Sequence, residues 1–563
     1  MVTMWNKQLA KLLYLGGPLV SIFLIDEIVT DPVNAPKLFI LGVVACGVLG
    51  AITVNLEVLK EKSFRVPLIL TLAFLMVSVF VLICSKGPIT QSIYGVYGRN
   101  NGFLAYIFLS LIFLGAIFLQ EKTMYKKIYF GILVAGLVNV FYCTWVTIFG
   151  DFLSWSNPYG NVLGTFGNPN FIGAFLGMFT TGWIALVLAG SVSTRVRLSS
   201  LIILPLAIFA ILQSHAIQGR VLLLGGASLV FFYWIKSKTS NKFVVTLYSM
   251  VVLGLGSVSL AGAFQRGPLT EYIYKTSVSL RGQYWLSGWN TGKTHLLSGV
   301  GFDGLGDWYR RMRDIEAITL PGPNTVVNAA HNVPLDLFAF GGAPLFAAYI
   351  LIVFYTGLLI AKNTFGNRQY DPIFVGISSM WVCYQIQSLI SINQLGLAVW
   401  GWLLSGTLIG YVKLTDSENL NKNIRNLKKQ NVKTVRKHYF GVNISIGIGM
   451  LVGALVALPP LSADIKWRTA QKSGNLMQIE ASLSQSYLNP QNNYKYLSNV
   501  LALEQSNLND LAYKYALEGL KFNPDNFDLW RALYILKKSS PEDRLKALKR
   551  MKVLDPLNPD VTK

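Results

Sequence analysis

Charged residues are few in this sequence. Asp, Glu, Lys and Arg make up 13% of its 563 residues, whereas a typical soluble domain has about 25%. Apolar residues make up 52%. These values exclude a single soluble domain and a disordered chain, and they predict an integral membrane protein.

Acidic residues are scarcer than basic ones. The chain has 27 Asp and Glu against 49 Lys and Arg, which gives a formal net charge of +22. An excess of this size is found in nucleic-acid-binding proteins. It is also found in membrane proteins, because Lys and Arg are retained in cytoplasmic loops. The places of the charges along the chain distinguish these two classes.

Cysteine is rare as well. Cys46, Cys84, Cys143 and Cys383 all fall inside apolar runs, and no Cys-x-x-Cys spacing occurs. We therefore expect no disulfide and no zinc site. The first apolar stretch, after Lys11, has no small-residue cleavage pattern, so we expect a membrane helix there rather than a removed signal peptide.

Thirteen apolar segments have about the length that a helix needs to cross a bilayer. The helices predicted at 199–213 and 219–235 are brief and their linker is short. The predicted spans are 8–25, 36–55, 66–85, 103–119, 128–149, 171–189, 199–213, 219–235, 243–263, 334–361, 372–390, 395–412 and 441–459.

Lys and Arg recur in every second loop between these spans. The loops 26–35, 150–170 and 391–394 contain neither. This alternation predicts a cytoplasmic N-terminus and a carboxy-terminal domain outside the membrane, as in a bacterial inner-membrane protein. The basic loop residues are Lys60, Lys62, Arg65, Lys122, Lys126, Lys127, Arg195, Arg197, Lys236, Lys238, Lys242, Lys362 and Arg368.

The predicted cytoplasmic loop 413–440 contains the densest basic run, at 422–437. No aromatic residue interleaves this run, so stacking on nucleic-acid bases is not expected. We interpret the run as an anchor to the inner leaflet and expect no nucleic-acid partner.

The tail, 461–563, has no long apolar run, and it contains a repeat. Pro490, Pro524 and Pro556 are spaced 34 and 32 residues apart, and Tyr496 and Trp530 follow the first two by six residues. This pattern resembles tetratricopeptide repeats, which are stacked helical hairpins. The tail is expected to be either a groove for a protein partner or a helical cap over the membrane domain.

The predicted spans have almost no ionisable residue at their centres, which argues against a transporter. Polar residues gather instead in four segments on the predicted outer side. They are 94–102 (Tyr-Gly-Val-Tyr-Gly-Arg-Asn-Asn-Gly), 164–170 (Gly-Thr-Phe-Gly-Asn-Pro-Asn), 213–220 (Gln-Ser-His-Ala-Ile-Gln-Gly-Arg) and the long loop 264–333. We expect a site at the outer face that a lipid-borne substrate reaches laterally.

The order of these motifs resembles the O-antigen ligase and polymerase superfamily, which includes bacterial protein O-oligosaccharyltransferases. The resemblance covers about 94–410. It rests on Gly-Asn-Pro-Asn before a helix, an Arg opening a helix, Arg-x-x-x-Trp followed by Gly-Val-Gly in the long loop, and His-Asn at the start of the next helix. Members transfer glycans from undecaprenyl pyrophosphate to hydroxyl acceptors, without a nucleotide sugar or an obligatory metal.

The resemblance implies that Arg220, Arg281 and His331 are the catalytic residues. One departure is Gly219, because family members often have Ser directly before the helix-start Arg. The tail repeats are an optional feature among relatives. Further candidates for substrate binding are Arg99, Asn168, Asn170, Tyr284 and Asn332.

The chemistry of these side chains suits such a transfer. Guanidinium groups bind phosphate oxygens bidentately and neutralise charge that develops on a pyrophosphate leaving group. A histidine such as His331 titrates near neutrality, so it can act as general base towards an acceptor hydroxyl. A direct displacement at C1 would invert the anomeric configuration. The outer loops lack a clear Asp-x-Asp element, so we expect no metal or other cofactor.

Each candidate also has a structural interpretation. Arg220 and Arg99 could anchor at the interface, and Arg281 could pair with Asp303 or Asp307. His331 with Asn332 could cap a helix, as could Asn168 with Asn170. These alternatives remain open at the level of sequence.

The sequence thus predicts an all-α polytopic membrane protein with about 13 spans and an extracytoplasmic α-helical repeat domain. Its predicted parts are the spans of 1–263, the catalytic loop 264–333, the spans of 334–460 and the repeats of 461–563. The predicted function is glycan transfer from a polyprenyl-pyrophosphate lipid to a lipid A core, a protein or a glycan. A polysaccharide polymerase, an exporter without covalent chemistry and a repeat-bearing scaffold are the alternatives.

Overall fold

The structure, a computed structural model, describes residues 4–425, 441–483 and 494–562. Helices make up 76% of it, and the described residues contain no strand. The amino-terminal half consists of α1 (Met4–Ile22), α2 (Asn34–Thr53), η1 (Leu56–Lys60), η2 (Lys62–Phe64), α3 (Arg65–Ile83), α4 (Ile89–Tyr94), α5 (Phe103–Ile117), α6 (Lys122–Phe149), η3 (Gly164–Phe166), α7 (Pro169–Val187), α8 (Thr194–Gln213), α9 (Ile217–Lys238) and α10 (Lys242–Ala263).

The remaining helices form the long loop, the later membrane helices and the tail. They are α11 (Thr270–Ile273), α12 (Thr276–Thr294), α13 (Leu305–Met312), α14 (Glu316–Thr319), α15 (Val333–Gly366), α16 (Pro372–Ser388), α17 (Leu395–Arg425), α18 (Val442–Ser473), α19 (Leu476–Leu483), α20 (Tyr494–Gln505), α21 (Asn509–Phe522), α22 (Phe527–Ile535), α23 (Pro541–Leu554) and α24 (Pro559–Thr562).

Each of the thirteen apolar segments forms a helix. Ten helices in the described part of the chain are long and apolar enough to cross a bilayer. The other three are α1, which is less apolar, and α5 and α16, which have 15 and 17 residues. A multi-pass arrangement in a lipid bilayer is thus supported, and the count of thirteen stays a prediction.

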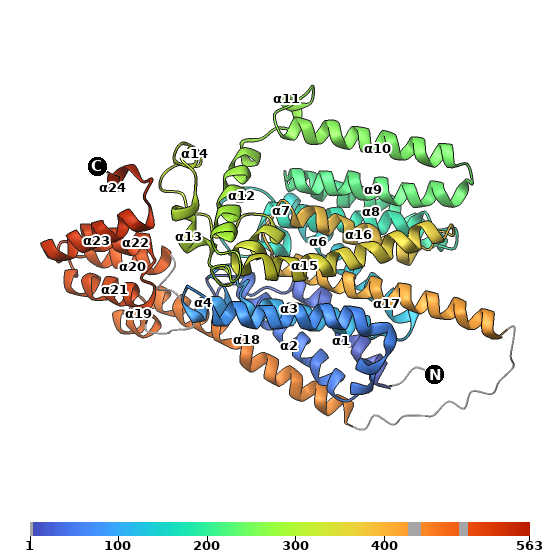
Figure 1. Cartoon of the computed structure of the whole chain (residues 1–563), viewed down its shortest axis with the longest axis horizontal. Coiled ribbons are helices and arrows are strands. Elements are labelled where there is room, and N and C mark those ends of the chain that lie inside the picture. The colour runs from blue at the N-terminus through green and yellow to red at the C-terminus, as the bar shows by residue number, and fades with distance from the viewer. Residues whose placement is uncertain (1–3, 426–440, 484–493, 563) are drawn as a thin grey trace.

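The long helices run side by side, and the short helices gather at one end of the bundle (Figure 1). That end, which we call the α12 end, carries α4, α11 to α14 and the tail helices α19 to α24. The described N-terminus and the facing ends of α17 and α18 lie at the opposite end. The motif-bearing segments 94–102 and 264–333 are therefore brought to one end of the molecule.

Glycines allow α2 and α18 to pack closely. A Cβ atom at Gly453 would lie within 2.7 Å of the Gly42 carbonyl carbon, and one at Gly449 would meet the Cys46 backbone at 2.9 Å. Small residues at helix contacts are a common basis of association in membranes, since apolar burial gives little driving force there. This contact fixes α18, and hence the base of the tail, against α2.

Helix α18 does not stop at Pro459 and Pro460 but continues to Ser473. Its last turns leave the core of the membrane helices, because Ala463 and Trp467 pack in a second hydrophobic cluster with the tail helices. The boundary between the membrane domain and the tail, near residue 460, therefore lies inside one continuous helix. The basic residues of 426–440 and the turn at Pro490 lie outside the described residues, so the repeat assignment stays a prediction.

Candidate functional site

His331 lies at the α12 end, directly before α15. Its backbone has φ of 57°, a left-handed conformation that residues other than glycine rarely adopt. Asp336 holds this turn, because its carboxylate accepts a hydrogen bond from the Ala330 N–H at 2.6 Å. Asn332 caps α15 by accepting from the Leu335 N–H at 3.1 Å. The capping interpretation of Asn332 is thus correct.

The imidazole of His331 is oriented by its own loop. Nδ1 lies 3.1 Å from the Ala329 carbonyl oxygen. A carbonyl oxygen only accepts, so Nδ1 carries the proton in the neutral ring and Nε2 keeps the lone pair. Burial, together with the charges of Arg99 and then Arg281, lowers the pKa of His331 to about 4. His331 is therefore a neutral base at physiological pH.

Arg281 lies on α12, inside the long loop. Its Nε donates to the Ile390 carbonyl oxygen at 2.9 Å, and its Nη1 donates to the Ser277 carbonyl oxygen at 3.2 Å. Burial lowers the pKa of Arg281. The expected alternative, an ion pair with Asp303 or Asp307, is absent among the described residues, so the positive charge of Arg281 has no carboxylate beside it to neutralise it.

Arg99 reaches the same place from the segment 94–102. Positive φ angles at Gly95 and Gly98, 87° and 80°, turn this segment, and the Val96 N–H donates to the Asp303 carboxylate at 2.7 Å. Nη1 of Arg99 is buried without a hydrogen-bond partner in the described structure. Burial raises the pKa of Asp303 to about 6, and the nearby Arg99 opposes that rise.

Tyr284 lies one turn after Arg281 on α12, and its ring packs against the imidazole of His331. Its ring centroid lies 5.3 Å from that of His331 and 6.4 Å from that of Tyr309 on α13. Tyr284 therefore joins α12 and α13 to the imidazole. The structure thus brings together His331, Arg281, Arg99 and Tyr284.

Arg220 lies in the first turn of α9 and its side chain is exposed. It has no hydrogen bond or ion pair with any described residue. Two residues earlier, Gln218 donates through Nε2 to the Ile390 carbonyl oxygen at 3.4 Å, the same oxygen that Arg281 contacts. The start of α9 therefore adjoins Arg281, while the side chain of Arg220 remains unengaged.

Close packing between α9 and α7 explains why position 219 is a glycine. A Cβ there would lie 2.7 Å from the Gly173 carbonyl oxygen of α7. A serine at this position would push α9 away from α7, so the departure from the family pattern follows from close helix packing.

Asn168 and Asn170 lie at the start of α7. The Asn168 side-chain oxygen accepts from the Asn170 N–H at 2.9 Å, and its Nδ2 donates to the Tyr159 hydroxyl at 3.0 Å. Asn168 is thus a helix cap, as the alternative interpretation held. No hydrogen bond or ring contact within the described ranges joins either asparagine to His331 or Arg281.

The Gly-Val-Gly motif has a structural role in the long loop. The Val300 and Gly301 N–H groups donate to the Ala339 and Phe340 carbonyl oxygens at 3.1 and 2.9 Å. These acceptors lie beside a break in α15, where Gly342 has φ of 65°. The motif therefore docks the long loop onto the kink of α15 at Gly341 and Gly342, ten and eleven residues beyond His331.

Sequence reasoning missed the segment 387–394, which comprises the end of α16 and the turn that joins it to α17. Its Ile390 carbonyl accepts from Arg281 and from Gln218. Its Asn393 amide lies 3.5 Å from the Asn101 side-chain oxygen, two residues after Arg99. The available signal was a run rich in Gln, Ser and Asn at the end of an apolar helix.

The tail binds the long loop through a buried ion-pair network. Both carboxylate oxygens of Asp555 accept from Nη2 of Arg313 at 2.8 Å, and both side chains are 0% exposed. Arg310 bridges Asp555 at 3.1 Å and Asp528 at 3.0 Å. Arg311 pairs with Asp525 at 2.9 Å. The segments around Pro524 and Pro556 thus contact α13 and Arg313, the residue that follows it.

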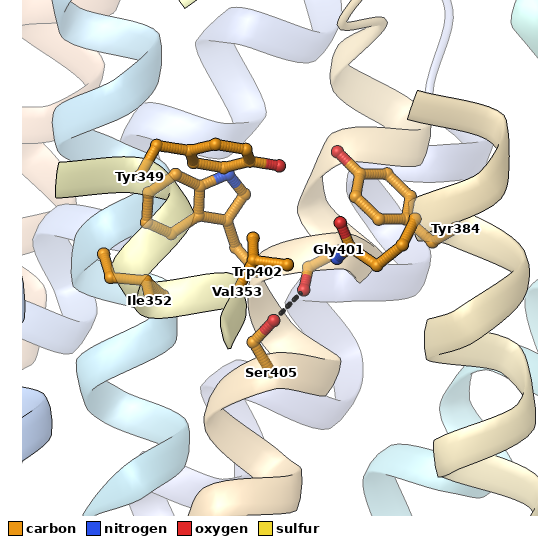
Figure 2. Close-up of a pocket in the computed structure, with 8 residues that line it drawn as sticks. Tyr349, Ile352, Val353, Tyr384, Gly401, Trp402 and Ser405 are labelled. Atoms are coloured by element: carbon orange, nitrogen blue, oxygen red, sulfur yellow. Dashed lines mark hydrogen bonds between the residues drawn. The ribbon is translucent and has the colours of Figure 1, made fainter. Parts of the chain in front are cut away.

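A small cavity of about 10 Å³ lies between α15, α16 and α17, lined by Tyr349, Tyr384, Trp402 and Ser405 (Figure 2). It has room for about one water molecule. Figure 2 also shows the Ser405 hydroxyl donating to the Gly401 carbonyl, which is an intrahelical contact at 2.7 Å. The cavity is too small for a substrate.

The cluster at the α12 end can bind an anion and accept a proton. Two guanidiniums, from Arg99 and Arg281, flank a neutral imidazole, and no group of three potential metal-ligating side chains occurs among the described residues. In comparisons with known proteins, no family model and no curated protein matched this chain.

Proposed function

We propose that this protein is a membrane glycosyltransferase that moves a glycan from a polyprenyl-pyrophosphate lipid to a hydroxyl acceptor. The observation that carries the proposal is the cluster at the α12 end, where the charges of Arg99 and Arg281 act on the buried imidazole of His331. A base beside two cations fits an acceptor hydroxyl that loses a proton near a departing dianion.

The proposed step is a single displacement. The acceptor O–H gives its proton to Nε2 of His331, and its oxygen forms a bond to C1 of the donor sugar. The bond between C1 and the phosphate oxygen breaks, and its electron pair leaves with the polyprenyl pyrophosphate. In this proposal Arg281 and Arg99 stabilise the charge on that leaving group, and the exposed Arg220 contacts its outer oxygens. The product has the inverted anomeric configuration.

The surroundings support a lipid-borne donor. Ten helices long and apolar enough to cross a bilayer lie in the described chain, and the cluster lies at one end of them. The basic loops that the sequence places in the cytoplasm belong to the other end, so we propose that the α12 end is extracytoplasmic. The acceptor could be a lipid A core, a protein or a glycan, and a polymerase would use the same step.

The test is in vitro transfer from a defined polyprenyl-pyrophosphate glycan to a panel of acceptors, with EDTA present and the protein in nanodiscs. We expect His331→Ala to lower kcat by about 100-fold or more, the usual contribution of a general base. Arg281→Ala should weaken donor use as well. His295→Ala is the matched control, because His295 lies at the same end but contacts Thr291 and Trp308 instead.

An exporter would give a different result. In proteoliposomes it would move the lipid-linked glycan across the bilayer without a new glycosidic bond. Donor translocation without product, in the intact protein and in His331→Ala alike, would reject the transferase proposal.

A further inference from the structure

Four carboxamide side chains are buried around the turn between α16 and α17. Gln387, near the end of α16, is 1% exposed, and Asn393 and Gln394, in the turn itself, are 4% and 3% exposed. Gln218, 5% exposed, joins it from α9 through its hydrogen bond to the Ile390 carbonyl. Buried polar groups nearly always have hydrogen-bond partners. A buried amide atom without such a partner therefore indicates a place where a ligand could bind.

Each of the four has one amide atom without a partner in the described structure: Gln218 Oε1, Gln387 Nε2, Asn393 Oδ1 and Gln394 Nε2. Two of these assignments follow from backbone contacts. Gln218 donates through Nε2 to a carbonyl, which leaves its oxygen free. Gln394 accepts through Oε1 from the Leu397 N–H at 3.1 Å, which leaves its NH₂ group free. The cluster therefore offers acceptors and donors together.

This mixture selects a class of ligand. An anion is bound by donors and a metal cation by oxygens, whereas a hydroxyl group both donates and accepts. The four side chains carry no charge, so they suit a neutral polyhydroxyl compound. Arg281 contacts the same Ile390 carbonyl, and Asn393 lies beside Asn101 near Arg99. The cluster therefore adjoins both guanidiniums.

We propose that Gln218, Gln387, Asn393 and Gln394 form a subsite for the sugar that is attached directly to the donor's pyrophosphate. This inference rests on the proposed function, because the same guanidiniums hold the pyrophosphate. The subsite recognises sugar hydroxyl or acetamido groups next to the bond that breaks. It would thereby select which donor glycans are used.

The experiment compares two lipids by fluorescence binding in nanodiscs: polyprenyl pyrophosphate with one N-acetylhexosamine, and polyprenyl pyrophosphate alone. The variants are Gln218→Leu and Gln387→Leu, because an apolar group of similar shape leaves no unpaired polar atom and is tolerated best in folding. We expect the preference for the glycosylated lipid to fall about tenfold, as for one or two lost hydrogen bonds. Affinity for the bare lipid should not change.

The matched control is Gln385→Leu, on the same helix but lining the small cavity of Figure 2. It should bind both lipids as the unaltered protein does. Equal loss of both lipids in Gln218→Leu and Gln387→Leu, with an unchanged melting temperature, would mean that the amides hold the pyrophosphate and would overturn the subsite. An unchanged preference in both variants would overturn it too. Failure of transfer by the unaltered protein, with sugar preference intact, would instead reject the proposed reaction alone.

Discussion

At the scale of single residues, the decisive feature is an imidazole that stays neutral beside two permanent cations. Burial and the charges of Arg99 and Arg281 hold the pKa of His331 near 4, well below its usual value of about 6.5. A histidine that must accept a proton is then active across the neutral range. It loses its function only when acid protonates it.

The pH dependence of kcat/KM tests this feature. The folded-state pKa is depressed, so the neutral, active form predominates above about 4 and the rate should fall as the pH drops through that value. Arg99→Met removes one of the two cations, so the acid limb should move up towards 6.5. The measurement is the rate at each pH, with recovery at pH 7 as the check against unfolding. If kcat/KM of the unaltered protein already fell at a pH near 6.5, this explanation would be contradicted.

The same burial affects stability. Because the unfolded histidine binds its proton at a higher pH than the folded one, the unfolded state holds more protons between about 4 and 6.5. Stability should therefore rise with pH through that window and level off above it.

At the scale of elements, the start of α9 depends on a glycine. A Cβ at Gly219 would lie 2.7 Å from the Gly173 carbonyl oxygen, whereas one at Gly225 on the same helix would meet nothing within 4 Å. We expect Gly219→Ser to cost about 1–3 kcal/mol of stability, the usual cost of overpacking, and to lower donor affinity by displacing Arg220. Gly225→Ala should change neither. Melting curves and donor binding measure both effects, and an unchanged Gly219→Ser protein would refute the argument.

Much of the fold could be predicted at this scale, because a long apolar run has few alternatives to a membrane helix. All thirteen predicted segments are helices. That His331 and Arg281 lie at the same end of the helix bundle could be predicted, because the charge pattern places both of their segments on one side of the membrane. The role of the segment 387–394 could not be predicted, since its carboxamide side chains carry no charge and do not recur at a regular spacing in the sequence. The role of Asn168 was equally ambiguous, because a capping side chain and a sugar-binding side chain have the same sequence signature.

At the scale of the whole molecule, the tail holds the long loop in position. Arg313 and Asp555 are fully buried, Arg310 is 5% exposed, and Arg310 also stacks on Phe527 at 4.3 Å. Tyr309, next to Arg310, stacks on Tyr284 and thereby connects the tail to His331. This contact favours the cap interpretation of the tail over an open groove on that face.

Breaking this network tests that connection. Asp555→Ala leaves the buried guanidinium of Arg313 without a carboxylate and leaves Arg310 with Asp528 alone, and breaking a buried pair in this way costs about 3–5 kcal/mol. We expect the tail to become protease-sensitive and kcat to fall while donor affinity persists. Asp510→Ala, which removes the exposed pair with Lys538, should leave both properties unchanged. Resistance to protease in Asp555→Ala would show that the tail is held by other contacts.

The pairing of Arg310 with Asp555 spans 245 positions of the chain. A ribosome therefore finishes α13 well before it makes the carboxylate that α13 binds, and three helices long and apolar enough to cross a bilayer, α15, α17 and α18, are made in between. During that interval Arg310 and Arg313 lack the carboxylate of Asp555. The contacts that complete the α12 end can thus form only late in synthesis, after most of the long apolar helices have been made.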